Sequence, residues 1–188
     1  MMASVTQSSQ SQLTAEEFGR RPDPGHPEEL VRGQICTMPP PGARHGKVCA
    51  KLVRFLGPHA DEFDLGHVLS NDSGVITERG PDSVRGPDVS FYSFARLPKG
   101  PIPENYPSVS PDLVFEVLSP HDRWPKVLAK VVEYLDAGVS VVGVLDPDRS
   151  TLHLYEGDEP VRILGSDDLL RVPKLLGDFQ VVVGRFFE

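Results

Sequence analysis

The sequence has few cysteines and no long apolar run. Its two cysteines, Cys36 and Cys49, are too few among 188 residues for a disulfide-stapled scaffold. No stretch is long and apolar enough for a transmembrane helix, and the first residues lack the basic start and apolar core of a secretory signal. We therefore expect a cytoplasmic protein with no membrane partner, whose cysteines are reduced thiols packed in the core.

Basic residues are fewer than acidic residues in this sequence. The chain has 19 Lys and Arg against 27 Asp and Glu, which gives a formal net charge of −8. Proteins that bind nucleic acid through bulk charge need Lys and Arg to displace counterions from phosphates. Any contact with DNA is therefore expected to be local or to depend on a metal ion. The sequence has no Gly-rich phosphate loop and no Gly-x-Ser-x-Gly elbow, so nucleotide binding and serine hydrolysis lack support.

Turn-forming residues, in contrast, are abundant. The 19 prolines and 17 glycines predict many short elements joined by turns. Residues 1–12 contain Ser, Gln and Thr but no charge, which is typical of a disordered leader. The remainder, residues 13–188, has the length of one domain.

The first half of the chain predicts two helices and a run of strands. Thr14 and Glu17 have the spacing of a capping box, which indicates a helix start. Apolar residues at three- and four-residue intervals predict an amphipathic helix over residues 43–56, ended by the Gly-Pro pair at 57–58. Short apolar runs separated by turns predict an antiparallel meander over residues 63–94.

The second half predicts an alternation of strand and helix. Residues 112–118 are nearly all apolar, which is typical of a central strand covered on both faces. Asp122 can then cap a helix, and residues 139–145 and 151–155 predict a buried strand and its hairpin partner. The order of elements predicts an α/β fold in which helices flank a mixed β-sheet.

Two acidic residues stand out as candidate metal ligands. Glu116 interrupts the apolar central strand, where a lone carboxylate costs several kcal/mol unless it is protonated, paired or metal-bound. Asp88 follows Pro87 at the start of another expected strand. Two carboxylates from neighbouring strands, completed by water, form the oxygen-rich site that Mg²⁺ prefers, and such a site can activate water against a phosphodiester. The alternatives are a structural ion pair for Glu116 and a turn role for Asp88; Asp112 has the same Pro-Asp form.

Lys130 is the third candidate. A count of 100° per residue places it at the flank of the apolar stripe on the helix that follows Glu116, whereas Lys126 falls further toward solvent. From there Lys130 could orient or deprotonate a water, or stabilise negative charge on a phosphate. The alternative is a helical lysine that extends its charge into water.

Several segments together are similar to the Uma family of restriction-endonuclease-like proteins, a bacterial branch of the PD-(D/E)XK nucleases. They are residues 29–33, 40–46, 72–74, 84–91 and 111–119, followed by Asp122, Lys130, Tyr134 and residues 138–139. The resemblance runs from about residue 13 to the C-terminus, and it is the order and spacing of the segments that make it specific.

This resemblance implies a restriction-endonuclease-like core in which Asp88 and Glu116 hold Mg²⁺ or Mn²⁺. The wider superfamily has a lysine two residues after the glutamate, where this chain has Leu118. The resemblance therefore implies that Lys130, on the following helix, takes the place of that lysine. It also implies DNA as the substrate and a homodimer that addresses two strands.

Two further residues keep more than one interpretation. Asp72 matches an acid of the family, and it is either a further ligand or a turn residue before Gly74. His45 occupies a helix start, where it could contact phosphate, cap the helix or pack. A zinc site of Cys36, His45, Cys49 and His59 is not expected, because the spacings follow no paired-ligand pattern.

The sequence thus favours a metal-dependent endonuclease that hydrolyses DNA phosphodiester bonds through Asp88, Glu116 and Lys130. Two other functions remain open. The first is a binding or assembly module that keeps the nuclease fold without activity, which the acidic charge and the missing Glu-x-Lys favour. The second is a phosphoesterase with a substrate other than DNA.

Overall fold

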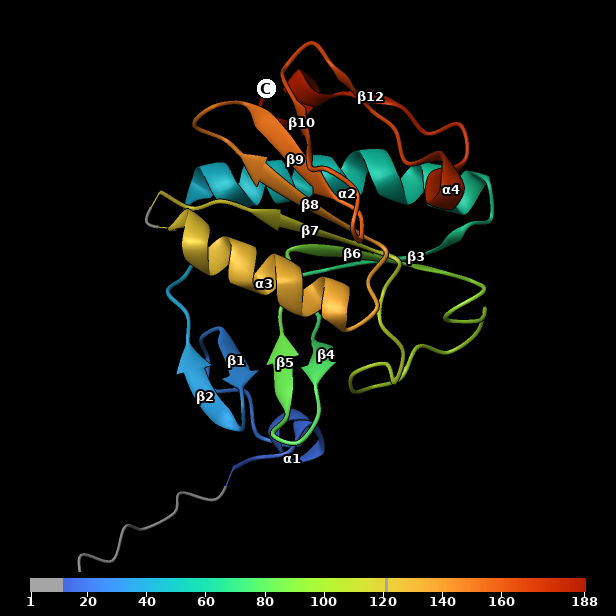
Figure 1. Cartoon of the computed structure of the whole chain (residues 1–188). Coiled ribbons are helices and arrows are strands. Elements are labelled where there is room, and N and C mark those ends of the chain that lie inside the picture. The colour runs from blue at the N-terminus through green and yellow to red at the C-terminus, as the bar shows by residue number, and fades with distance from the viewer. Residues whose placement is uncertain (1–11, 121) are drawn as a thin grey trace, which may run out of the picture.

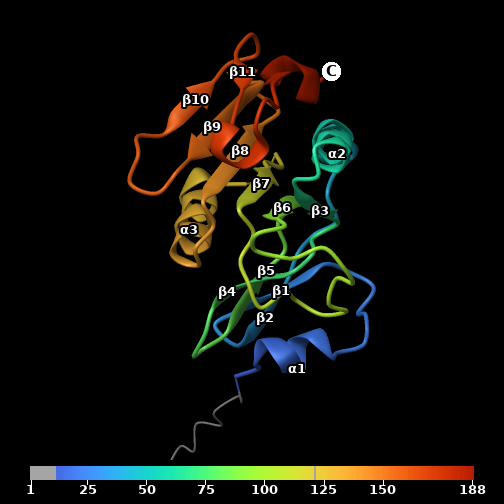
Figure 2. The same ribbon diagram turned by 90° about the vertical axis from the view of Figure 1, so that its right-hand side faces the viewer.

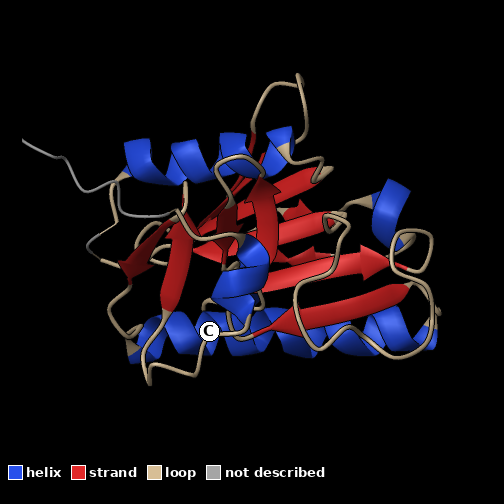
Figure 3. Ribbon diagram, turned by 90° about the horizontal axis from the view of Figure 1, so that it is seen from below, coloured by secondary structure: helices blue, strands red, loops and turns tan. Residues whose placement is uncertain are grey.

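A six-stranded mixed sheet divides the molecule, and one long helix covers each of its faces (Figures 1 and 2). The computed structural model describes residues 12–120 and 122–188, so the expected leader lies, apart from its last residue, outside the described residues. The strand order is β10-β9-β8-β7-β6-β3, and β7 and β8 form its parallel pair. The strands are β3 (Gly66–Ser70), β6 (Val89–Ser93), β7 (Leu113–Val117), β8 (Val141–Asp146), β9 (Thr151–Tyr155) and β10 (Arg162–Leu164). Helix α2 (Ala43–Glu62) packs on one face and α3 (Trp124–Asp136) on the other, as expected for an α/β fold (Figure 3).

A second, four-stranded antiparallel sheet lies below α3 in Figure 1, with the order β2-β1-β5-β4. Its strands are β1 (Glu28–Val31), β2 (Gln34–Thr37), β4 (Val75–Glu78) and β5 (Ser83–Arg85). The short helix α1 (Ala15–Gly19) closes this end and begins with the expected capping box of Thr14 and Glu17. At the other end lie β11 (Leu169–Leu170), α4 (Pro173–Leu176), β12 (Val181–Val182) and the 3₁₀ helix η1 (Val183–Phe186).

The strands between residues 63 and 94 are antiparallel, but they do not follow one another in a single meander. Strands β3 and β6 pair in the large sheet, whereas the hairpin of β4 and β5 belongs to the small one. The hairpin carries apolar side chains on both faces. Val75 packs with the residues of α3, and Val84 packs with Leu30 and Ala15. The hairpin can therefore bury both faces only if it lies between α3 and α1.

Helix α2 does not end at the Gly-Pro pair but continues to Glu62. Leu56 and Ala60 extend the buried stripe of this helix by a further turn, and their burial favours continuation. Pro58 removes one helical hydrogen bond, whose acceptor would be the carbonyl of Arg54. Both Pro58 and Arg54 are exposed, so water can satisfy that carbonyl.

Helix α3 begins at Trp124, and Asp122 is not its cap. The carboxylate of Asp122 instead accepts a hydrogen bond from the backbone N–H of Ser119, at 2.7 Å, and closes the turn that precedes the helix. Pro125 lies in the first turn, as expected, because the first amide groups of a helix have no helical partner.

Side-chain alternation along β7 decides which way Glu116 points. Phe115 and Val117 belong to the apolar cluster below α2, and Val114 belongs to the cluster below α3. Because neighbouring residues of a strand point to opposite faces, Glu116 lies on the α3 face with Val114. The only acidic residue of the central strand is therefore directed toward Lys130.

The two cysteines do not share one environment. Both are free thiols, but Cys36 is exposed on β2, so the expectation that it packs in the core is wrong. Strand β2 lies at the edge of the small sheet, where none of its residues is buried. Cys49 is half-buried on α2 and borders the core cluster.

Candidate active site

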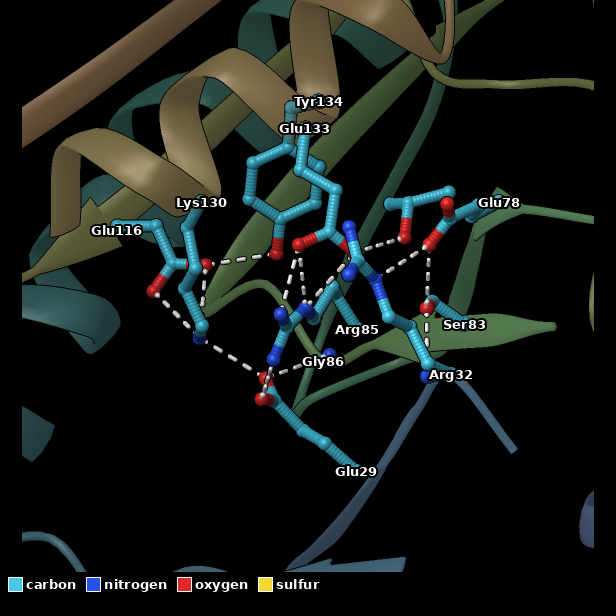
Figure 4. A network of polar contacts seen from close by, with 11 residues as sticks. Glu29, Arg32, Glu78, Ser83, Arg85, Gly86, Glu116, Lys130, Glu133 and Tyr134 are labelled. Carbon is cyan, nitrogen blue, oxygen red and sulfur yellow. Dashed lines mark hydrogen bonds and ion pairs between the residues drawn. The ribbon is translucent and has the colours of Figure 1, made fainter. Parts of the chain in front are cut away.

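Glu116 meets two residues from one face of α3 (Figure 4). The hydroxyl of Tyr134 donates a hydrogen bond to Oε1 of Glu116 at 2.7 Å. The Nζ atom of Lys130 lies 3.4 Å from both carboxylate oxygens of Glu116. Residues four apart on a helix lie one above the other, so Lys130 and Tyr134 reach the same carboxylate. The structure thus brings together Glu116 and Lys130, as the sequence predicts.

Lys130 has a second and closer partner, which the sequence does not predict. Its Nζ atom lies 2.8 Å from Oε1 of Glu29, a residue of β1 that is only 5% exposed. Glu29 also accepts from Arg85 at 2.9 Å and from the backbone N–H of Gly86 at 3.2 Å. Burial opposes the ionisation of Glu29, but attraction to Lys130 and Arg85 outweighs it and holds the pKa of this carboxyl below its usual value.

Arg85 of β5 joins the small sheet to α3 through an ion pair with Glu133. Its Nε atom lies 3.0 Å from each carboxylate oxygen of Glu133, and a second guanidinium nitrogen donates at 2.7 Å. Such forked pairs are the strong form of ion pair. The hydroxyl of Thr77 on β4 donates to the same carboxylate at 2.6 Å. A continuous polar network therefore runs from the small sheet through α3 to Glu116 (Figure 4).

The environment keeps Lys130 charged. Burial disfavours its ammonium, but the negative charges of Glu116 and Glu29 outweigh that effect and raise its pKa above the usual value. A lysine that stays protonated at neutral pH cannot accept a proton. Of the chemical roles considered from the sequence, the geometry therefore favours stabilisation of negative charge over deprotonation of water.

The carboxyl of Glu116 has the opposite character. Burial is the main reason that its pKa is raised to about 7, and the negative charge of Asp88 adds to the effect. Lys130 and the hydrogen bond from Tyr134 lower the pKa but do not compensate fully. Glu116 is therefore a buried carboxylate whose negative charge is only partly balanced by the protein, which is the condition that a bound cation would relieve.

Asp88 lies at the start of β6, alongside the end of β7. Val89 pairs with Phe115 in the antiparallel register, so the residue before Val89 comes beside Glu116. One oxygen of Asp88 accepts from the backbone N–H of Val117 at 2.7 Å, and the other lies 3.2 Å from Nε2 of His45. The strand register and the influence of the Asp88 charge on Glu116 both agree with the sequence prediction that two strands present these acids near one another.

His45 and Cys49 of α2 complete the surroundings of Asp88. The hydrogen bond to Asp88 is the main cause that raises the pKa of His45. One ligand atom from each of His45, Cys49 and Asp88 lies within 4.8 Å of the other two. The structure does not bring His45 and Cys49 together with Cys36 and His59 in a four-residue zinc site, as expected from the sequence. Cys36 is exposed, and His59 contacts the backbone carbonyl of Leu176 at 2.8 Å.

Asp72 occupies a turn close to this group. Its φ of +54° is in the left-handed region, which suits a turn residue. Desolvation and the negative charge of Asp88 raise the pKa of its carboxyl. A Cβ atom at Gly86 would lie 2.9 Å from Cβ of Asp72, so the glycine allows this turn to approach the strand that carries Asp88. The structure is thus compatible with both interpretations of Asp72.

Asp112, the other Pro-Asp acid, is remote from these residues. It lies at the opposite end of β7 from Val117, where it pairs with Arg96 at 2.9 Å and accepts from the backbone N–H of Ser93 at 2.7 Å. Its surroundings are those of a structural ion pair. The sequence motif alone therefore does not separate Asp88 from Asp112, whereas their neighbours do.

Comparison with known proteins identifies the family. The model of the Uma2 family, described as "putative restriction endonuclease", matches residues 15–184. The chain belongs to the Uma2 family. This confirms the resemblance inferred from the motifs, and with it a restriction-endonuclease-like, nuclease-related protein. No curated protein matches the chain.

A solved structure shares the fold of this Uma2 protein. It is described as a "putative nuclease belonging to DUF820" from Anabaena variabilis, and it aligns with a TM-score of 0.80 at 22% sequence identity. The alignment covers 93% of this chain and 97% of the other. The mixed sheet flanked by helices is therefore a fold that an experimental structure also shows. None of the helices in the described residues has the length and apolar content needed to cross a membrane.

Proposed function

We propose that this Uma2 protein is a metal-dependent endonuclease that hydrolyses DNA phosphodiester bonds. The observation that carries the proposal is the placement of two largely buried carboxylates, Asp88 and Glu116, at neighbouring positions of β6 and β7. Burial there raises the pKa of Glu116 to about 7, which supports the proposal. In this proposal Asp88 and Glu116 bind Mg²⁺ or Mn²⁺, and Lys130 is a fixed positive charge.

The chemistry of the donors fits a hard cation. Carboxylate oxygens from two adjacent strands are the ligands that Mg²⁺ and Mn²⁺ prefer. Among the described residues, the hydrogen-bond partner of Oε2 of Glu116 is Lys130 at 3.4 Å, which leaves this oxygen available to an ion. When bound, the ion supplies a water of lowered pKa and positive charge for the phosphate. Restriction-endonuclease-like proteins generally use divalent metal ions, which also supports the proposal.

The remaining residues position and charge the site. Lys130 stays protonated, so it stabilises the negative charge that develops on the phosphate during attack by water. Tyr134 holds one oxygen of Glu116 and fixes the direction of the other. Glu29 holds the ammonium of Lys130 in place through a 2.8 Å contact. DNA binding in this acidic chain would then depend on the metal and on Lys130 rather than on bulk charge.

A module without activity is the competing function, and one observation favours it. The charges of four residues largely satisfy one another while they join the small sheet to α3; the residues are Glu29, Arg85, Lys130 and Glu133. A network with that purely structural task would need no cation. It predicts that removal of the Glu116 carboxylate leaves Mn²⁺ affinity unchanged.

Plasmid cleavage in Mg²⁺ or Mn²⁺ tests the proposal. We expect Asp88→Ala and Glu116→Ala to reduce cutting by at least about 100-fold, the scale on which a group that stabilises transition-state charge acts. Asp112→Asn is the matched control, since it alters a buried Pro-Asp acid outside the site and should keep activity. Equal cutting by the wild type and both alanine variants would refute the assignment. Sedimentation of the wild type tests the expected homodimer separately.

A further inference from the structure

The side chains of His45 and Cys49, which the proposed nuclease site does not use, form a group with Asp88. His45 and Cys49 are four residues apart on α2, so they lie on one face of the helix. Nδ1 of His45 lies 3.5 Å from Sγ of Cys49, and Nε2 lies 3.2 Å from Oδ1 of Asp88. The side chains of His45 and Asp88 are only 12% and 11% exposed.

A group of this kind differs from the oxygen site in the cation that it suits. Thiolate, imidazole and carboxylate together are typical ligands of Zn²⁺ and similar borderline ions, whereas Mg²⁺ is bound by oxygen. One ligand atom of each side chain lies within 4.8 Å of the others. Nδ1 of His45 faces Cys49 and Nε2 faces Asp88, so the ring has to turn for one nitrogen to join both partners on a single tetrahedral ion. Three protein ligands would leave the fourth position to water, as in exchangeable or catalytic zinc sites.

The electrostatic surroundings also favour a cation. The charges of Asp72 and Glu116 add to that of Asp88 at the imidazole of His45. Zinc binds cysteine as the thiolate, so the thiol proton of Cys49 would leave to solvent as the metal–sulfur bond forms.

We propose that His45, Cys49 and Asp88 form a binding site for a thiophilic divalent cation of the Zn²⁺ class. The site shares Asp88 with the proposed Mg²⁺ site but takes its other ligands from α2. An ion bound there would share the carboxylate of Asp88 with an ion bound at Glu116. Neither the ligand set nor its test depends on nuclease activity.

Cobalt binding to the full chain, without DNA, tests this site. We expect Co²⁺ to bind with about one equivalent and to give a thiolate-to-cobalt charge-transfer absorption. Cys49→Ser should abolish that absorption and weaken binding by at least about 10-fold. Mutation of a residue that only hydrogen-bonds to a metal ligand already lowers metal affinity by about 10-fold or more, and loss of a ligand should cost at least as much. Cys36→Ser is the matched control, because it removes the exposed thiol of the chain and should change neither property. Absence of the absorption in the wild type, or its persistence in Cys49→Ser, would overturn the proposal.

A measurement on the wild type alone keeps the test independent of how the variants fold. X-ray absorption of the Zn²⁺-loaded protein should show one sulfur neighbour at about 2.3 Å and lighter ligands at about 2.0–2.2 Å. Nitrogen and oxygen neighbours without sulfur would overturn the site.

The variant Glu116→Ala separates the two proposals. It should keep the cobalt absorption, since Glu116 is not a ligand of this site, whereas the proposed nuclease site would lose its ion. The two proposals can therefore fail separately.

Discussion

Lys130 is held more closely by Glu29, at 2.8 Å, than by Glu116, at 3.4 Å. The lysine that the sequence assigns to Glu116 is thus primarily the partner of a carboxylate from the small sheet. Burial is the main reason that the pKa of Glu116 is raised to about 7, and the longer contact with Lys130 offsets that effect only in part. Since Glu29 belongs to β1, we expect the position of this strand to influence how strongly Glu116 attracts a cation.

Glu29→Gln should destabilise the protein and weaken the binding of Mn²⁺. Arg85 and Lys130 would lose a shared counter-charge in a buried position, which costs about 3 kcal/mol in the free energy of unfolding. Lys130 would then turn to Glu116 and compete with the metal. Urea unfolding measures the first effect, and calorimetric titration with Mn²⁺ measures the second.

The exposed pair of Asp64 and Lys99 provides the control for Glu29→Gln. The side chains of both residues are more than half exposed, at 65% and 59%, so the pair contributes little to stability. Asp64→Asn should change the free energy of unfolding by less than about 1 kcal/mol. Similar losses in both variants would contradict the importance of the buried network.

Tyr134→Phe should raise the pKa of Glu116 above about 7. The tyrosine hydroxyl stabilises the ionised carboxylate through a 2.7 Å hydrogen bond, and the variant removes that bond while it keeps the ring. The loss should also cost about 1–2 kcal/mol in stability. Carbon-13 NMR titration of the Glu116 carboxyl in metal-free protein measures the pKa. Tyr92→Phe, which alters a buried tyrosine of β6 that has no contact with Glu116 among the hydrogen bonds of the described residues, should leave it unchanged.

Glu116→Gln should stabilise the metal-free protein increasingly as pH rises. The pKa of Glu116 is about 7 in the folded chain against an ordinary value of 4.5. Between these values the folded state binds more protons than the unfolded state, so the free energy of unfolding of the wild type falls as pH rises through this window. Glutamine does not titrate, so the free energy of unfolding of the variant does not fall for this reason. Unfolding in urea with EDTA, from about pH 5 to about pH 8, measures the difference between the two proteins; a difference that does not grow with pH would contradict the raised pKa.

The local part of the site could be predicted from the sequence. An acid within an otherwise apolar strand indicates Glu116, and the helical count of 100° per residue separates Lys130 from Lys126. The structure confirms that Lys130 reaches Glu116. The assignment of metal binding and catalysis to these residues stays a prediction.

The partners from distant parts of the chain could not be predicted. Glu29 reaches Lys130 because Leu30 pairs with Val84 across the small sheet, a pairing of strands that lie 54 residues apart in sequence. His45 reaches Asp88 because α2 packs on the face of β6 and β7. Periodicity describes which side of an element is buried, but it does not say which element covers it. The same limit explains why one expected meander is divided between two sheets.

Asp72→Asn separates the two interpretations of Asp72. Asparagine tolerates the left-handed backbone at this position, where φ is +54°, so the variant removes the charge and keeps the turn. If the charge supports a cation at Asp88, Mn²⁺ affinity should fall by about 5–10-fold, the lower end of the range for coupling between two sites. The free energy of unfolding of the metal-free protein should change by no more than about 0.5 kcal/mol, because the variant also relieves repulsion from Asp88.

Ser73→Ala is the control for Asp72→Asn. It removes a 2.7 Å hydrogen bond to the carbonyl of Ser70 and should lower the free energy of unfolding by about 1 kcal/mol without loss of Mn²⁺ affinity. Unchanged Mn²⁺ affinity in Asp72→Asn would identify Asp72 as a turn residue alone.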